Sequence, residues 1–171
     1  MPKKQPRHPR IKVFTYLGSP MVEFTVFGKA QPGGSKSAIP YRTKNRKSGM
    51  GVRVTDSNPH AQEWKNRCAM VAAEAWDKDS AGLLSGPLAV FFDFIRARPR
   101  GHYGTGRNAG KLKDSAPAYP TVMPDGLKLT RPVEDALTGV LWTDDAIVVA
   151  HLISKKYGPR PGVTIKVWSM Q

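Results

Sequence analysis

A helix followed directly by a strand, within residues 124–153, is the feature that most constrains the fold. Pro132 lacks a backbone N–H, which only first-turn residues can lack without losing a hydrogen bond. The helix therefore cannot begin much before Lys128 or Leu129, and we expect it to begin just past Asp125. Gly139 is positioned to end it as a C-capping residue. Apolar residues at helical spacing form one stripe: Leu129, Val133, Ala136 and Leu137.

The run that follows, residues 146–153, is rich in Val and Ile and predicts a strand opened by Asp144 and Asp145. Side chains alternate between the two faces of a strand, so these carboxylates point to opposite faces if both already belong to it. At most one of them is then a direct partner of Asp125.

Carboxylates concentrate in this same unit. Five of the thirteen Asp and Glu residues lie at positions 124–145 beside only two basic residues, although the whole chain has a net charge of +14. The acidic residues are Asp125, Glu134, Asp135, Asp144 and Asp145, and the basic residues are Lys128 and Arg131. An acidic pocket in a basic protein indicates a divalent metal held against a polyanion. For Asp135, an ion pair with Arg131 is the alternative.

The overall charge indicates the class of partner. The chain has 27 Lys and Arg residues and a pI near 10.2. Each of these side chains that neutralises a phosphate releases condensed counterions, so the balance favours a nucleic-acid partner. A ribosomal or chromatin-like binding protein is the competing interpretation.

The length of the chain and its cysteine content indicate how many domains to expect and in which cellular compartment. A chain of 171 residues suits one domain, and we expect a basic, flexible arm at 1–20 and a single domain at 21–171. Cys68 is the only cysteine, so no disulfide can form within the chain, and a cytoplasmic location is expected. No apolar run approaches the ~20 residues that span a bilayer, so we expect no membrane partner.

Further elements complete the predicted fold. Three runs predict strands, Val22–Phe27, 88–95 and 162–168, and the apolar middle run suits a central strand. A helix capped by Ser57 or Asn58 is predicted to continue to about Trp76, with Cys68 on its apolar stripe. The expected class is α+β (mixed α/β), with a small mixed sheet of about four strands flanked by two main helices.

Basic residues outside the acidic unit are the expected phosphate contacts: Lys36, Arg42, Lys44, Arg46, Lys47, Arg53, Arg98 and Arg100. The first six lie in a stretch that contains Gly and Ser, for which a solvated loop is the alternative. The last two open a long loop at 96–120, and loops of this length are usually functional or disordered.

Asp93 is the unusual residue of the central strand. Burying a lone carboxylate is costly. It either pairs with a cation or faces the acidic pocket as a further metal ligand.

The order of these residues resembles a known family. Pro124-Asp125, a basic residue within a turn, Asp-Ala-Leu-x-Gly from Asp135, a hydrophobic pair, Asp144-Asp145 and a Val/Ile-rich strand together resemble the RusA family of Holliday-junction resolvases, common in phages and prophages. The likeness extends to residues 24–32, which resemble the family's first strand and Gly-x-Pro loop, and to the final strands. It covers most of residues 21–168.

The resemblance implies a dimeric, magnesium-dependent endonuclease that binds four-way DNA junctions and nicks opposing strands. The family motif Pro-Asp-x-Asp-Asn-x-x-Lys falls on Asp125, Leu127, Lys128 and Arg131, in that order. Asp125 and Asp145, the second residue of the downstream pair, are implied as metal ligands. Leu127 occupies the place of the family's second Asp, and Asp144, Asp135 and Asp93, in that order, are the candidates to replace it.

Catalytic roles follow from the same comparison. Lys128 or Arg131 could stabilise negative charge that develops during phosphodiester hydrolysis, and both remain candidates. Mg²⁺ is the expected cofactor, with Mn²⁺ as an alternative, since both accept oxygen ligands. We expect branched DNA and a second copy of the chain as partners, in the host cytoplasm if the protein is phage-encoded.

The sequence thus predicts a metal-dependent endodeoxyribonuclease that resolves Holliday junctions or other branched DNA by paired phosphodiester hydrolysis. Two alternatives remain at this point. One is a catalytically weakened homologue that still binds branched DNA. The other is a basic RNA-binding protein whose acidic cluster is structural.

Overall fold

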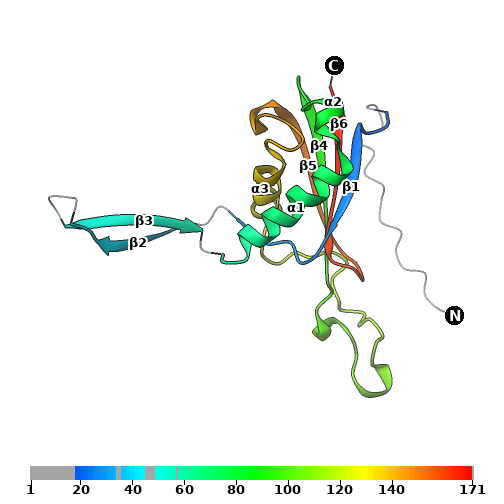
Figure 1. Cartoon of the computed structure of the whole chain (residues 1–171). Helices are drawn as coiled ribbons and strands as arrows, with labels where there is room; N and C mark the ends of the chain where they lie inside the picture. Colours follow the sequence, from blue (N-terminus) through cyan, green and yellow to red (C-terminus); the bar gives the residue numbers. More distant parts are fainter. Residues whose placement is uncertain (1–17, 34–35, 45–48, 57, 171) are drawn as a thin grey trace.

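The structure is a computed structural model that describes residues 18–33, 36–44, 49–56 and 58–170. Most of the arm expected at 1–20 lies outside these residues, as do Arg46 and Lys47. The described part forms a four-stranded sheet, a separate two-stranded ribbon and three α-helices (Figure 1).

The main sheet is mixed and has the strand order β1-β6-β4-β5. Its strands are β1 (Val22–Phe27), β6 (Gly162–Ser169), β4 (Leu88–Arg96) and β5 (Val148–Tyr157). β6 runs antiparallel to both of its neighbours, whereas β4 and β5 are parallel. The apolar strand β4 is interior, as expected, and the α+β class is confirmed.

Two helices, α1 (Ala61–Ala75) and α3 (Gly126–Leu137), cover one face of this sheet (Figure 1). Alternate residues of the strands point toward them and form one core with the apolar stripes of both helices. Its fully buried members include Val26, Cys68, Phe92, Val133 and Ile165. The predicted stripe of α3 is confirmed, because all four of its residues are buried.

The start of α1 differs from the expectation. The helix begins at Ala61, and its N-cap is His60 rather than Ser57 or Asn58. The Asn58 carboxamide accepts a hydrogen bond from the His60 N–H at 3.1 Å and donates one to Gln31 Oε1 at 3.1 Å. Asn58 therefore shapes the entry to the helix and ties it to the loop after β1.

The start of α3 lies just past Asp125, as expected, but Pro132 does not belong to its first turn. Pro132 lies in the second turn, because the helix already begins at Gly126. An interior proline leaves the carbonyl four residues earlier without its N–H partner. That carbonyl belongs to Lys128, and the Gly33 N–H donates to it at 2.9 Å. The loop after β1 supplies the missing hydrogen bond, so the first-turn expectation for Pro132 was wrong.

The chain turns sharply between α3 and β5. Gly139 has a φ of +79°, which glycine adopts without the steric cost that other residues incur, and it ends the helix as expected. Asp144 then caps a 3-10 turn, η4 (Asp145–Ile147), and β5 begins only at Val148. The strand expected from residue 146 therefore starts two residues later, and neither carboxylate belongs to it.

The basic stretch for which a solvated loop was the alternative forms a ribbon within its described residues, 36–44 and 49–56. β2 (Lys36–Arg42) and β3 (Met50–Asp56) pair antiparallel and extend away from the body of the protein (Figure 1). The loop alternative was wrong here, because Ile39, Tyr41 and Val52 supply the β-branched and aromatic side chains that favour strands.

A second extension lies between β4 and α3. It contains two 3-10 turns, η2 (Arg100–His102) and η3 (Gly106–Asn108), and projects from one end of the sheet (Figure 1). A further short helix, α2 (Lys78–Ala81), precedes β4. No helix within the described ranges has the length and apolar character needed to cross a membrane.

Candidate functional site

Asp125 caps the N-terminal end of α3. Its carboxylate accepts a hydrogen bond from the Lys128 N–H at 2.7 Å, and the Lys128 ammonium lies 4.0 Å from the same carboxylate. Such a cap satisfies one of the free N–H groups at a helix start. Both side chains remain about half exposed, at 56% and 46%, so a ligand in solvent can reach them.

The segment that leads into Asp125 is held by two basic residues. The Arg96 guanidinium donates to the carbonyls of Val122 and Met123 at 3.2 and 3.1 Å. The Lys155 ammonium donates to the carbonyl of Pro124 at 3.0 Å. These bonds fix the entry of α3 against the ends of β4 and β5.

A pocket of about 510 Å³ opens beside this helix entry. The loop after β1, the end of β4 and the first residues of α3 line it, including Lys29, Gln31, Arg96, Pro124 and Leu129. Two cations and several backbone groups thus border a concave surface next to Asp125. The loop after β1, which belongs to the family-like segment at residues 24–32, meets α3 here.

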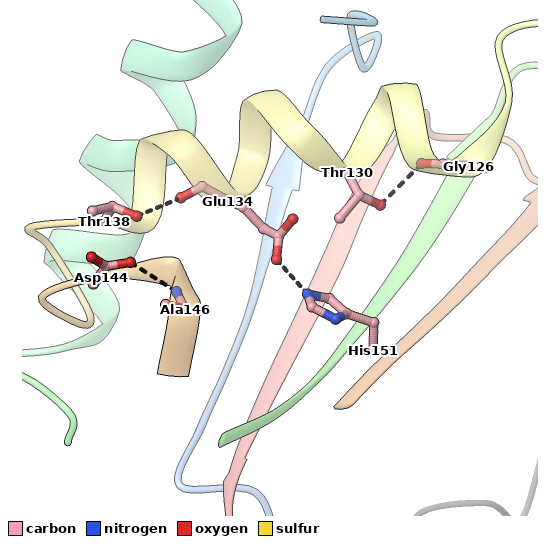
Figure 2. A network of polar contacts seen from close by, with 7 residues as sticks. All are labelled: Gly126, Thr130, Glu134, Thr138, Asp144, Ala146 and His151. Carbon is pink, nitrogen blue, oxygen red and sulfur yellow. Dashed lines mark hydrogen bonds and ion pairs between the residues drawn. The ribbon is translucent and has the colours of Figure 1, made fainter. Parts of the chain in front are cut away.

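Two of the other expected metal ligands, Asp144 and Asp145, lie beyond the far end of α3. Asp144 accepts from the Ala146 N–H at 2.8 Å and sits near Thr138, whereas Gly126 marks the opposite end of the helix (Figure 2). A helix of 12 residues is about 18 Å long. The structure therefore does not bring Asp125 and Asp145 together within one chain.

Asp135 and Asp93 have cationic partners in the body. Asp135 lies 2.5 Å from the Lys65 ammonium of α1, so its ion pair joins two helices instead of the alternative partner Arg131. Asp93 pairs with Lys156 and accepts from the Ser154 hydroxyl at 2.5 Å. For Asp93 the cation pairing weighed from the sequence is confirmed.

One polar pair at this site was not identified from the sequence. The Glu134 carboxylate on α3 contacts His151 Nε2 on β5 at 2.5 Å (Figure 2). The His151 ring also stacks on Phe92, with 6.4 Å between ring centroids. Two features could have pointed to this pair. Glu134 belongs to the acidic set, and His151 lies on the core-facing side of its strand, where it pairs with Val90.

The basic residues expected to contact phosphates divide into two groups. Lys36, Arg42, Lys44 and Arg53 lie on or next to the ribbon, and all but Lys44 belong to its strands. Arg98 and Arg100 lie in the second extension. The Arg98 guanidinium stacks 4.2 Å from the Tyr157 ring centroid and donates to the Pro117 carbonyl at 2.8 Å, so it also supports that extension.

A basic α+β body with a projecting cationic ribbon, and with carboxylates at both ends of one surface helix, has the features of a protein that acts on nucleic acid. The family model described as "Endodeoxyribonuclease RusA" matches residues 37–168. The chain belongs to the RusA family of endodeoxyribonucleases, and the resemblance stated above is confirmed. A comparison with curated proteins gives no match. Family membership implies endodeoxyribonuclease activity on branched DNA.

Nucleases of this family generally depend on a divalent metal, so the carboxylates can be tested for a site. Among the described residues, no group of three or more His, Cys, Asp or Glu side chains is placed to hold a metal ion. Beside Asp125, the family's second Asp is replaced by Leu127, which is 74% exposed. Asp125 is thus the exposed carboxylate that would hold a divalent ion at the helix entry, and the family's second carboxylate there is missing.

Proposed function

We propose that the protein is a metal-dependent endodeoxyribonuclease that resolves Holliday junctions or other branched DNA by paired phosphodiester hydrolysis. The family match carries this proposal, because its residues 37–168 include the ribbon, both main helices and the acidic residues. That span also supports a single nuclease domain at residues 21–171. Asp125 and Asp145 are the proposed metal ligands, with Asp144 and Asp135 as further candidates, and Mg²⁺ or Mn²⁺ is the proposed ion.

The cations of α3 are proposed to act on the scissile phosphate. Lys128 and Arg131 both lie exposed on the helix, and Lys128 is near the Asp125 carboxylate. A fixed positive charge beside a phosphate stabilises the negative charge that grows in the transition state. Arginine holds its charge at all relevant pH values, whereas lysine can also release a proton.

A cleavage assay on a four-way junction tests this function. We expect wild-type protein with Mg²⁺ or Mn²⁺ to nick the junction, and Asp125→Asn and Asp145→Asn to bind it without nicking. Asp79→Asn on α2 is the matched control, because it removes an exposed carboxylate away from α3. Cleavage by Asp145→Asn at the wild-type rate would remove Asp145 from the site.

Leu127 favours a second candidate, a homologue that binds branched DNA without cutting it. An aliphatic side chain at the second Asp position removes a ligand that the family motif supplies. In that case wild-type protein binds the junction in preference to linear duplex and RNA at matched salt, and neither metal produces nicks. Equal affinity for all three nucleic acids would contradict both candidates.

A further inference from the structure

The ribbon and the second extension leave the body at the same pocket. Pro32 and Asn58 flank the ribbon in sequence, and both line the pocket of about 510 Å³ beside Asp125. Ala97 and Pro124 flank the second extension, and they line the same pocket. Every segment that enters or leaves either projection therefore passes this pocket. From there the ribbon and the second extension project in different directions (Figure 1).

The bases of both projections are held at the entry of α3. On the side of the ribbon, the Gly33 N–H donates to the Lys128 carbonyl at 2.9 Å. On the side of the second extension, the Arg96 guanidinium donates to the Val122 carbonyl at 3.2 Å and so joins the two ends of that extension. Both projections are thus anchored next to the carboxylate of Asp125, which caps α3.

The second extension is folded, although it adds nothing to the core. No residue between positions 97 and 119, a stretch that the structure describes throughout, is buried. Its shape comes from its own hydrogen bonds. The Gly104 N–H donates to the Lys111 carbonyl and the Lys113 N–H to the His102 carbonyl, both at 2.9 Å. A loop of this length usually carries function, and here core packing does not account for it.

The charge of the second extension indicates phosphate as its ligand. Between positions 97 and 123 the sequence has five Lys and Arg residues against one acid, Asp114. Arg100 and Arg107 are exposed, and within the described part of the chain neither guanidinium has a hydrogen-bond or ion-pair partner. Each can therefore contact a phosphate without giving up an internal bond. The ribbon is cationic as well.

We propose that the ribbon and the second extension bind two different arms of a branched DNA, and that the pocket between their bases receives the branch point. Double-stranded DNA is stiff, with a persistence length of about 150 base pairs, so a short linear duplex does not bend to follow two diverging elements. Two arms of a branched DNA diverge from one point in this way. The inference rests on the proposed action on branched DNA, and it assigns the selectivity for a branch to the second extension.

The same placement brings the branch to the candidate catalytic residues. Asp125 and Lys128 are about half exposed beside the pocket, and Lys29 and Arg96 line it. At a branch point the continuous base stack is interrupted, so the backbone there enters a concave surface more easily than that of a regular duplex. A phosphate at the branch then lies next to the carboxylate that is proposed to hold the metal ion.

Binding without divalent metal tests the inference separately from cleavage. Fluorescence anisotropy compares a four-way junction with a linear duplex of equal length at several salt concentrations. Arg100→Gln combined with Arg107→Gln should lower junction affinity about tenfold, and the slope of log affinity against log salt by about 2 units. Duplex affinity should fall less, because a duplex needs only one projection. Lys78→Gln combined with Lys166→Gln is the matched control, since it removes the same charge from α2 and β6 and should leave the junction preference unchanged.

The outcomes separate this inference from the nuclease function. If the Arg100 and Arg107 variant keeps the wild-type preference for the junction, while wild-type protein nicks the junction with Mg²⁺ or Mn²⁺, the inference is overturned and the nuclease function stands. If wild-type protein never nicks, yet the variant loses the preference, the inference is supported and the nuclease function is overturned. Equal losses of affinity for junction and duplex also overturn the inference, because the second extension then does not select a branch.

Photo-crosslinking locates the two arms directly and does not depend on a charge variant. The crosslinker p-benzoylphenylalanine replaces Leu112 in the second extension or Val52 in the ribbon, which are 48% and 60% exposed. Both positions should crosslink to a junction whose four arms differ in sequence. A chain with the crosslinker at both positions should carry fragments of two different arms after the arms are cut free at restriction sites. Met70, 65% exposed on α1, is the control position and should give no crosslink. Fragments of a single arm, or no crosslink from position 112, would overturn the inference.

Discussion

The body of the protein and its ribbon are held together differently. In the body, strands and helices share one core in which Phe92 and Ile165 are fully buried. In the ribbon, Ile39, Val52 and Val54 are each more than half exposed, at 52%, 60% and 58%. Two strands alone are marginally stable in water. The same residue types therefore stabilise one region and stay available to a partner in the other.

This difference shows that a sequence can form strands without burying their side chains. Alternation forms the ribbon, but no helix covers either of its faces (Figure 1). Lys36, Arg42 and Arg53 in its strands give it positive charge, and a two-stranded ribbon fits the major groove of DNA. The ribbon is thus shaped for contact rather than for stability.

The largest expected effect tests that contrast directly. Phe92→Ala should lower the free energy of unfolding by about 3–5 kcal/mol, because it leaves a cavity in a packed core. Ile39→Ala should change it by less than about 0.5 kcal/mol, because that side chain is exposed. Urea unfolding followed by tryptophan fluorescence measures both. A large loss for Ile39→Ala would show that the ribbon is packed in solution.

Most of the body could be predicted from sequence, because its signals are local. β1, β4 and β6 follow from alternation or apolar runs, and the stripe of α3 follows from helical spacing. The interior position of Pro132 in α3 could not be predicted. It depends on the Gly33 N–H, which is distant in sequence, replacing the hydrogen bond that Pro132 lacks.

The residues of the candidate site could be proposed from the sequence, but their arrangement could not. The resemblance to the RusA family singles out Asp125 and Asp145, and the helix between them was predicted, but their placement at its opposite ends depends on the path of the chain after Gly139. The contacts of Asp135 with Lys65 and of Glu134 with His151 depend on how α3 packs against α1 and β5. Tertiary contacts of this kind leave no periodic trace in the sequence.

The second prediction concerns the ribbon's charge. Replacing Lys36, Arg42, Lys44 and Arg53 together with Gln should leave the unfolding free energy nearly unchanged and weaken junction binding. If each contacts a phosphate, the slope of log affinity against log salt should fall by about 3 to 4 units. Fluorescence anisotropy at several salt concentrations measures the slope. Replacing four cations of the body, Lys65, Arg67, Lys78 and Lys166, should have a smaller effect, and equal slopes would contradict a DNA-binding ribbon.

The third prediction concerns the core thiol. Burial raises the pKa of Cys68 from 9.0 to about 12. Between these values the unfolded chain releases a proton that the folded chain keeps, so the thiol's contribution to stability is complete below pH 9 and is lost as pH rises toward 12. The loss is about 1.4 kcal/mol per pH unit above 9. Urea unfolding of wild type and Cys68→Ala from pH 8 to 10.5 should show this slope only in wild type, and parallel curves would contradict it.

The smallest effect concerns the joint between the two regions. Gly33 is the last described residue before the ribbon, and a Cβ at this position would lie 3.1 Å from the Pro132 ring. A methyl group there should strain the Gly33 hydrogen bond to Lys128 and cost roughly 1 kcal/mol of unfolding free energy. Gly101→Ala is the control, because a Cβ at Gly101 meets no atom within 4 Å and should be neutral or slightly stabilising.

If Gly33→Ala lowers both stability and junction affinity, the contact between Gly33 and α3 also positions the ribbon for binding. If it lowers stability alone, the ribbon positions itself on DNA independently of α3. Thermal unfolding and anisotropy on the same samples separate these cases. Equal stability of Gly33→Ala and Gly101→Ala would contradict the close packing of Gly33 on Pro132, and with it the account of how α3 tolerates an interior proline.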